Sequence, residues 1–347
     1  MYKYLMLSHL KIKLAFLIIG LGLLTSCSND NITESDNHEI SSESERHYLI
    51  HFDGDNRKVV TEIDSNYYIY GDVLVDKANV TYVRELHTDD EVYTAIDEVN
   101  SFMASEKKMS IALTPGQSNI WSGATLWPNG IVKFHIPEDT FSSQQMSWFK
   151  QAADEWNTKT NVTITFVDRT DPGYKIIAEK VKSGCSCTVG YESKIGARNG
   201  TMRISDTCDL ISFIHEMGHA IGFGHEHQRP KALEYLTFYS EDDYLALHRI
   251  LLGNGIRNPQ VIIKLLKLNL QIESVHNDWP PYEYNSVMHY SSWPRNNQHL
   301  KNVMKANDMP LFKNKFTGKE IPRPSYGITP KDADKTNLAY SRFTLEL

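Results

Sequence analysis

Several features that would assign this 347-residue chain to other protein classes are missing from it. Basic residues are not in excess, since 36 Lys and Arg stand against 43 Asp and Glu, and this balance argues against nucleic acid as a partner. The sequence has no internal repeat of a solenoid period. It has only four cysteines, which are Cys27, Cys185, Cys187 and Cys208. The length is sufficient for one sizeable core plus a smaller domain.

Long hydrophobic runs are also missing, apart from one near the N-terminus. The apolar run Leu14 to Leu24 follows three lysines and is too short to span a membrane with its flanks. It ends in Leu24-Thr25-Ser26-Cys27, which resembles a bacterial lipobox. We therefore expect residues 1–27 to be a lipoprotein signal peptide, with lipid on Cys27 attaching the protein to a membrane. An ordinary secretory signal is the alternative.

Either signal implies export, so disulfides are permitted. We expect an outer-membrane or cell-surface lipoprotein of a bacterium, or a form released from it. Residues 28–46 are rich in Ser, Asn, Asp and Glu and contain almost no large apolar residue. Such a composition cannot bury enough surface to fold, so we interpret this segment as a flexible tether.

The next segment, residues 47–118, regains a core-forming pattern. Tyr67 to Val75 and Val80 to Val83 have the composition of strands, and Asp89 to Ala104 has the periodicity of an amphipathic helix. Nothing in it resembles a catalytic constellation. We interpret it as a folded pro-segment, with a separate binding module as the alternative. The turn-rich residues 114–125 mark its boundary with the following domain.

The chain's most informative motif is His215 to Glu226, which reads H-E-x-x-H-x-x-G-x-x-H-E. Histidines four residues apart lie on one face of a helix, so His215 and His219 can bind one metal ion from the same side. The motif's glycine allows a backbone turn that brings His225 round as a third ligand. Three imidazoles and one open position form the ligand set of a catalytic zinc. We expect one Zn²⁺ per chain, with Glu216 beside it.

Patterns around the motif predict the rest of this domain. A helix is expected over Ser142 to Lys159, and strands over Ile131 to Ile136 and Val162 to Val167. Cys185 to Gly190 has the pattern of a short edge-like strand. The stretch 249–275 is longer than we expect, and either an extra helix or a lid is compatible with it.

Four further stretches resemble the astacin family of metzincin zinc endopeptidases. They match the opening of the family's mature domain, its S-G-C-x-S-x-V-G strand, its Met-turn and its closing helix, and are Leu126–Ile131, Ser183–Gly190, Tyr282–Tyr290 and Thr329–Tyr340. Together with the zinc motif, the resemblance is in register over roughly residues 120–343.

The resemblance implies an α+β fold with a metzincin-like catalytic domain over residues 119–347. In that fold a mixed β-sheet and long helices form an upper subdomain, the lower subdomain is irregular, and the active-site cleft lies between them. A small N-terminal pro-domain precedes it.

The resemblance also implies roles for single residues. Glu216 is the general base and acid, and Met288 lies in the hydrophobic floor beneath the metal. Tyr290 is a mobile fifth ligand that stabilises the oxyanion. Glu226 links through water to the new N-terminus of the mature enzyme. The implied zinc ligands are His215, His219 and His225.

A disulfide between Cys185 and Cys208 is implied as well, with Cys187–Cys208 as an alternative. The strand Ser186 to Val189 is expected to pair with an extended substrate, whose main-chain hydrogen bonds give affinity without fixing sequence. His227 and His289 neighbour the proposed site residues, and we expect them to lie at the surface or behind the ligands.

The family's zymogen latch is an F-x-G-D aspartate that occupies the zinc, and this chain has two candidates. Asp55 ends a literal match, Phe52-Asp53-Gly54-Asp55. Asp72 precedes the apolar run Val73-Leu74-Val75, which matches the run that follows the latch in relatives. We favour Asp72.

The sequence therefore predicts a secreted or lipid-anchored zinc endopeptidase, made as a zymogen, that hydrolyses peptide bonds of protein or peptide substrates. A surface binding protein or adhesin on an inactive protease scaffold is the alternative, and the intact Glu216 argues against it. A peptidase that serves as an immunity or bacteriocin factor is a third possibility, which the sequence does not separate from the first.

Overall fold

The computed structural model of the protein describes residues 46–51, 57–63, 66–69, 73–75, 80, 82–88, 91, 92, 94, 95, 98, 125–182, 184–191, 199–256, 259–270, 272, 281–294 and 298–341. The expected lipidation site Cys27 and both latch candidates, Asp55 and Asp72, lie outside the described residues. Every described residue belongs to one compact unit, Glu45–Leu347. Within these residues, no helix combines the length and apolarity needed to cross a membrane.

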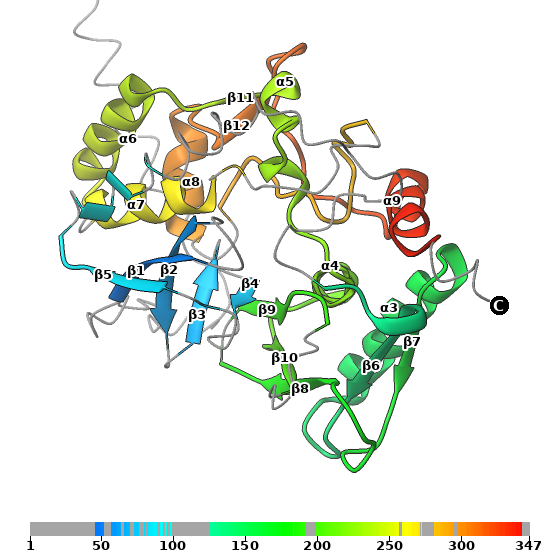
Figure 1. Cartoon of the computed structure of the whole chain (residues 1–347). Coiled ribbons are helices and arrows are strands. Elements are labelled where there is room, and N and C mark those ends of the chain that lie inside the picture. Colours follow the sequence, from blue (N-terminus) through cyan, green and yellow to red (C-terminus); the bar gives the residue numbers. More distant parts are fainter. Residues whose placement is uncertain are drawn as a thin grey trace, which may run out of the picture. The chain divides into compact units, whose positions relative to one another are not determined.

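A ten-stranded sheet joins the N-terminal and catalytic segments (Figure 1). Its spatial order is β5-β1-β2-β3-β4-β9-β10-β8-β6-β7. The strands are β1 Arg46–His51, β2 Arg57–Ile63, β3 Asn66–Ile69, β4 Val73–Val75, β5 Tyr82–Leu86, β6 Ile131–His135, β7 Thr163–Phe166, β8 Ile176–Lys180, β9 Cys185–Thr188 and β10 Gly200–Ile204.

The N-terminal half of this sheet is antiparallel, and it differs in detail from the prediction. β1 begins at Arg46, which we had expected to be the last residue of the tether. The strand predicted over Tyr67 to Val75 is an antiparallel pair, because β3 and β4 lie side by side with Tyr67 opposite Val75. The residues described between 91 and 98 are helical, and Val92 and Ala95 pack into a small core against β1, β2 and β5.

β9 is not an edge strand, contrary to the prediction. β4 runs parallel to it, with Val73 opposite Cys187 and Leu74 opposite Thr188. A strand edge presents unpaired N–H and C=O groups that accept another strand. The N-terminal segment therefore occupies the edge of β9, where we had expected an extended substrate to pair.

Two long helices pack behind the catalytic half of the sheet. α3 (Ser143–Lys159) and α4 (Leu210–Ile221) each begin with a capping box, in which an N-cap side chain and the third helical residue exchange hydrogen bonds. The helices contact one another, and α4 also contacts β9. Trp156 of α3 is fully buried between them and donates its Nε1–H to the Ile214 carbonyl at 3.0 Å.

Both ends of the catalytic segment are attached to the C-terminal end of α4. Near the start, Trp127 donates its Nε1–H to the Ala220 carbonyl at 2.7 Å. It precedes a short 3₁₀ turn, η3 (Pro128–Gly130). Near the end, Tyr340 of α9 (Pro330–Tyr340) donates its hydroxyl to the Ile221 carbonyl at 2.7 Å. These two bonds satisfy carbonyls that the last turn of a helix leaves unpaired.

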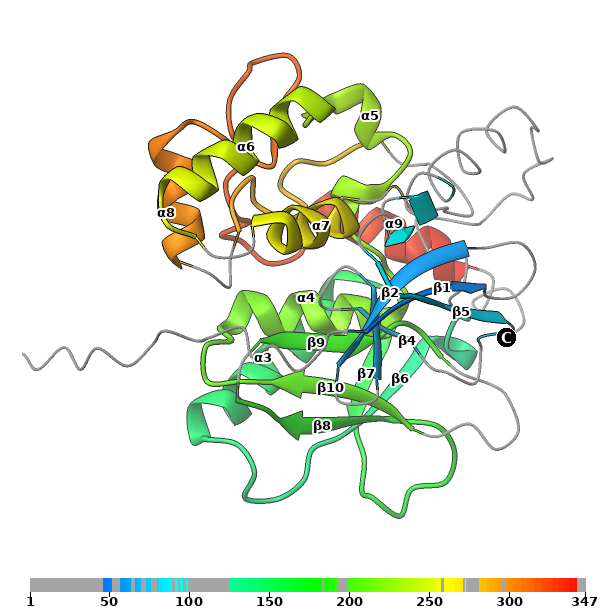
Figure 2. The ribbon, with the colours of Figure 1, turned by 90° about the vertical axis from the view of Figure 1, so that its left-hand side faces the viewer.

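A second apolar cluster lies in the lower subdomain, separate from the core around α3 and α4. Figure 2 shows three of its helices, α6, α7 and α8, gathered together. The elements of the lower subdomain are η4 Glu226–Gln228, α5 Ala232–Tyr235, α6 Glu241–Gly253, α7 Pro259–Asn269, α8 Gln298–Ala306 and the paired strands β11 Leu236–Phe238 and β12 Phe312–Asn314.

This subdomain is more regular than the irregular one we had predicted. Most of the described residues in the long stretch 249–275 belong to the end of α6 and to α7, so an extra helix is present there. Its reason is visible in the sequence, since Ile262, Ile263 and Leu266 follow helical spacing and are all buried in the second cluster.

Candidate metal centre

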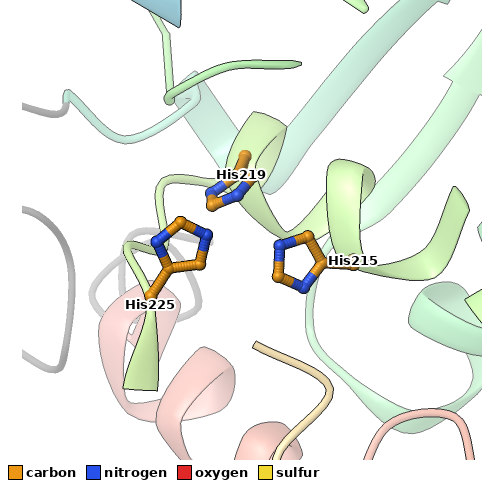
Figure 3. A group of neighbouring side chains, drawn as sticks. All are labelled: His215, His219 and His225. Atoms are coloured by element: carbon orange, nitrogen blue, oxygen red, sulfur yellow. The ribbon is translucent and has the colours of Figure 1, made fainter. Parts of the chain in front are cut away.

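Three imidazoles meet at the end of the helix α4. His215 and His219 lie one turn apart on α4, and the chain then turns at Gly222, where φ is 123°. A side chain would be strained at this angle, so glycine is required there. The turn returns His225 to the other two rings, and Figure 3 shows the three rings converging. One nitrogen of each ring lies within 4.8 Å of the others, and all three residues are buried.

The second nitrogen of each imidazole binds an oxygen of the protein. Carbonyl and amide oxygens only accept hydrogen bonds, so each Nδ1 must carry a hydrogen and each Nε2 must keep its lone pair. The three bonds run from His215 Nδ1 to Val287 O (2.7 Å), from His219 Nδ1 to Phe223 O (2.8 Å) and from His225 Nδ1 to Gln228 Oε1 (2.6 Å).

This donor set fits a single zinc ion. Neutral imidazoles that donate their other N–H to an oxygen are the usual form of metal-ligating histidine. Three such ligands leave one position of a tetrahedral ion for water or substrate, as in catalytic zinc sites.

Glu216 and Tyr290 both lie at this centre. Glu216 is on α4 between His215 and His219 and is 3% exposed. The ring of Tyr290 is half-buried, with its centroid 4.3 Å from that of His225 and 6.2 Å from that of His215. Tyr290 packs against the lower cluster, whereas α4 belongs to the upper core. The histidine triad therefore lies where the two subdomains meet.

Met288 lies directly against α4, the helix that carries His215 and His219. It is buried in the upper core, and Gly218 of α4 has no side chain where Met288 packs. A Cβ on Gly218 would lie well inside van der Waals contact with Met288 Sδ, and 3.2 Å from Trp156 Cζ2. The glycine is thus required for the close approach of the Met-turn to α4.

Glu226 belongs to a buried ion network that the sequence did not reveal. Its carboxylate accepts hydrogen bonds from Arg229 Nη1 (2.6 Å), Lys335 Nζ (2.7 Å) and the backbone N–H of Glu283 (2.9 Å). Burial raises the pKa of Glu226, but the cations of Lys335 and Arg229 outweigh it, so the pKa lies below its usual value. The expected link from Glu226 to a new N-terminus stays a prediction.

A second buried carboxylate, Asp332 of α9, holds the Met-turn. It accepts from the Ser286 hydroxyl at 2.5 Å and from the Val287 N–H at 3.0 Å. The Val287 carbonyl is in turn the acceptor for His215. The backbone N–H of Glu226 also donates to the Met288 carbonyl at 2.9 Å. The Met-turn is therefore held by hydrogen bonds to α9 and to the zinc motif.

The remaining histidines of this region lie behind the ligands rather than at the surface. His227 is fully buried, and its ring centroid is 4.6 Å from that of Tyr290. His289 contacts Tyr282, and burial lowers its pKa to about 4, so it is neutral at ordinary pH. Neither belongs to the metal-binding group among the described residues.

The three cysteines that the structure describes form one disulfide and one thiol. Cys185 is bonded to Cys208, as the resemblance implied, so the alternative through Cys187 is not present. Cys187 is buried in β9, and burial raises the pKa of its thiol well above the usual value. The nearby charge of Glu216 raises it further. Cys187 is therefore protonated at ordinary pH, and among the described residues it does not belong to the histidine group that could hold a metal.

Comparison with known proteins finds similarity to one family of peptidases. The sequence model of the astacin peptidase family matches residues 119–244. Bone morphogenetic protein 1 of Xenopus laevis is 30% identical over 167 residues, which are 48% of this chain and 20% of that protein. Nematocyst expressed protein 6 of Nematostella vectensis is 27% identical over 215 residues, covering 62% of this chain and 65% of that protein.

A solved structure gives a weaker match. High choriolytic enzyme 1, described as a hatching enzyme zinc-protease from Oryzias latipes, has a TM-score of 0.45 and 19% identity. The match covers 65% of this chain and 98% of that one.

The contact between Gly218 and Met288 gives the first prediction. Gly218→Ala should push Met288 away and lower zinc affinity, and overpacking of this kind costs about 1–3 kcal/mol of unfolding free energy. Gly253→Ala is the control, since a Cβ at Gly253 meets nothing within 4 Å. Zinc titration and urea unfolding of both variants measure the effects. Equal zinc affinity in the two variants would show that the Met-turn does not depend on this contact.

The N-terminus of α4 gives a prediction about pH. Asp209 caps the helix and forms two charged hydrogen bonds with Arg323, each 2.5 Å. Burial raises the pKa of Asp209, but the bonds from Arg323 and Ser212 outweigh it and hold the pKa well below its usual value. The folded state thus binds this proton less readily than the unfolded state, so acid favours unfolding.

Asp209→Asn should keep the cap but lose the charge pair. Its unfolding free energy should fall below that of wild type at neutral pH. The difference in unfolding free energy between wild type and Asp209→Asn should become smaller as the pH falls below about 4, where the carboxyl of the unfolded wild type becomes protonated. Urea unfolding across this range tests it, and a gap that is independent of pH contradicts it.

Proposed function

Because the sequence model of the astacin peptidase family matches residues 119–244, we propose that the protein is a zinc-dependent endopeptidase acting on protein or peptide substrates. The observation that supports it most is the triad itself. One nitrogen of each imidazole lies within 4.8 Å of the others, each Nδ1 binds an oxygen of the protein, and a buried glutamate lies on the helix that carries His215 and His219. The matched segment is only 20% of the Xenopus relative, so peptide-bond hydrolysis is the one activity that we propose from this similarity.

The residues around the triad suit this reaction. Zinc in a three-imidazole site supplies Lewis acidity, which acidifies water and polarises a peptide carbonyl. The Glu216 carboxylate takes a proton from the attacking water, a C–O bond forms, and the carbonyl becomes a tetrahedral oxyanion. Glu216 then passes the proton to the leaving nitrogen as the C–N bond breaks. The Tyr290 hydroxyl donates a hydrogen bond to the oxyanion.

The chain is further proposed to be made as a zymogen, in which residues 47–118 inhibit the domain over residues 119–347. The pairing of β4 with β9 supports this proposal, because β4 occupies the edge of β9 that we expect to pair with an extended substrate. Asp72 directly precedes Val73, the first residue of β4 that pairs with β9. This adjacency favours Asp72 over Asp55 as the latch.

Export with lipid on Cys27 completes the proposal. It is supported by the basic residues, the short apolar run and the lipobox-like Leu24-Thr25-Ser26-Cys27 in the sequence. The lipid would hold the enzyme at a bacterial membrane through the tether over residues 28–46. A binding protein on an inactive scaffold is not favoured, since the chain retains both the three ligands and Glu216.

Removal of the general base tests the enzyme proposal. In a chain that begins at Gln117, Glu216→Gln should retain zinc and lose hydrolysis of a protein substrate by about a hundredfold or more. Removal of zinc by a chelator should abolish activity, and added zinc should restore it. Glu234→Gln makes the same change at an exposed position of α5 and should have wild-type activity. Equal activity in Glu216→Gln and wild type would rule out the proposed mechanism.

The latch is tested separately in the full-length precursor. Asp72→Ala should raise proteolytic activity before any cleavage of the chain, because an aspartate would no longer block the metal. Asp55→Ala is its matched comparison and should leave the precursor inactive. Activity should be measured together with gel analysis, which reports cleavage. Activation by Asp55→Ala alone would reverse the assignment, and activation by neither would remove the latch from the proposal.

A further inference from the structure

The third histidine is held differently from the other two. The Nδ1 atoms of His215 and His219 bind main-chain carbonyls, whose positions are set by the backbone. His225 Nδ1 instead binds a side chain, the amide of Gln228, at 2.6 Å. A glutamine amide can present either its oxygen or its NH₂ group. By itself it does not decide which nitrogen of His225 keeps a lone pair for a metal.

A helix outside the zinc motif removes this ambiguity. Gln228 Nε2 donates a hydrogen bond to the carbonyl oxygen of Asn269 at 3.0 Å. A carbonyl can only accept, so it fixes the NH₂ group on its own side and turns Oε1 toward His225. Gln228 is fully buried, which keeps the amide in this packed position. His227 Nε2 donates to the same carbonyl at 3.3 Å.

The carbonyl of Asn269 is available because of its place in the fold. Asn269 is the last residue of α7, and the last carbonyls of a helix have no partner inside it. They also form the negative end of the helix dipole, which favours hydrogen-bond donors. α7 is held in place by Ile262, Ile263 and Leu266, which are buried in the lower cluster. The lower cluster thus determines where this carbonyl points.

We propose that α7 is a positioning element of the zinc site. Its terminal carbonyl orients the Gln228 amide, and Gln228 holds His225 in the tautomer whose Nε2 binds the metal. The stretch 249–275 then contributes to zinc affinity although none of its described residues lies in the histidine triad. This inference rests on the zinc site of the proposed function, but it concerns metal affinity and not hydrolysis.

The first part of the test asks whether residue 228 acts as a hydrogen-bond acceptor for His225 or only fills space. Zinc dissociation constants of the full chain are measured by competition with a chromophoric chelator. Gln228→Met loses both hydrogen bonds at similar length and should bind zinc about 10–100-fold more weakly, as expected when a ligand's supporting partner is removed. Gln228→Glu keeps an oxygen for His225 Nδ1 and should bind zinc more tightly than Gln228→Met. Equal affinity in both variants overturns the role of Gln228.

The second part tests α7 itself with a matched pair of substitutions. Leu266 of α7 and Leu300 of α8 lie in the same cluster and are each 6% exposed. Leu266→Ala and Leu300→Ala should lower the melting temperature of the metal-free protein by similar amounts. Only Leu266→Ala should weaken zinc binding, because only α7 ends at Asn269. Equal zinc affinities in this pair overturn the proposal, and this comparison decides the matter if Gln228→Met does not fold.

These outcomes are distinct from failure of the proposed function. A wild-type chain that binds no zinc removes the metal site and this inference together. A wild-type chain that binds zinc, with variants of unchanged affinity, contradicts only the role of α7.

Discussion

Three oxygen atoms of the protein determine what this site can bind. They accept hydrogen bonds from the Nδ1 atoms of His215, His219 and His225, and so leave three Nε2 lone pairs directed inward. Each oxygen comes from a different place, namely the Met-turn, the turn that ends α4, and η4. A cluster of histidines without these acceptors would be free to rotate or change tautomer. The fold can therefore be understood as the means of holding these three oxygens in place.

Near His225, buried charged side chains hold the surrounding elements in place. Glu226 and Asp332 are two carboxylates, and Arg229 and Lys335 are two cations, and all four side chains are buried. Buried charges are tolerated when they are paired, and removal of one partner leaves an uncompensated charge in the interior. The network connects α9, at the C-terminal end of the described chain, to the zinc motif and the Met-turn. It explains why a helix so far along the sequence belongs to the metal centre.

Local features were predictable from the sequence because they depend on spacing. The H-E-x-x-H pattern predicted α4, and the apolar spacing from Ser142 to Lys159 predicted α3, in which Ser142 is the N-cap. The features that depend on packing were not predictable. Nothing in the pattern of Val73-Leu74-Val75 shows that β4 pairs with β9. The composition of Tyr67 to Val75 likewise does not show that this stretch is two paired strands, β3 and β4. Gln228, Lys335 and Asp332 are polar residues that a sequence suggests are exposed, and only tertiary contacts bury them.

We expect the three oxygens that hold the Nδ1 atoms to direct three Nε2 atoms to one zinc ion. Anomalous diffraction at the zinc absorption edge, on crystals grown with zinc, measures this directly. We expect one anomalous peak per chain, about 2.0–2.1 Å from Nε2 of His215, His219 and His225, with each Nδ1 still bonded to its oxygen. A zinc ion bound through any Nδ1, held by only two of the histidines, or located away from them would contradict it.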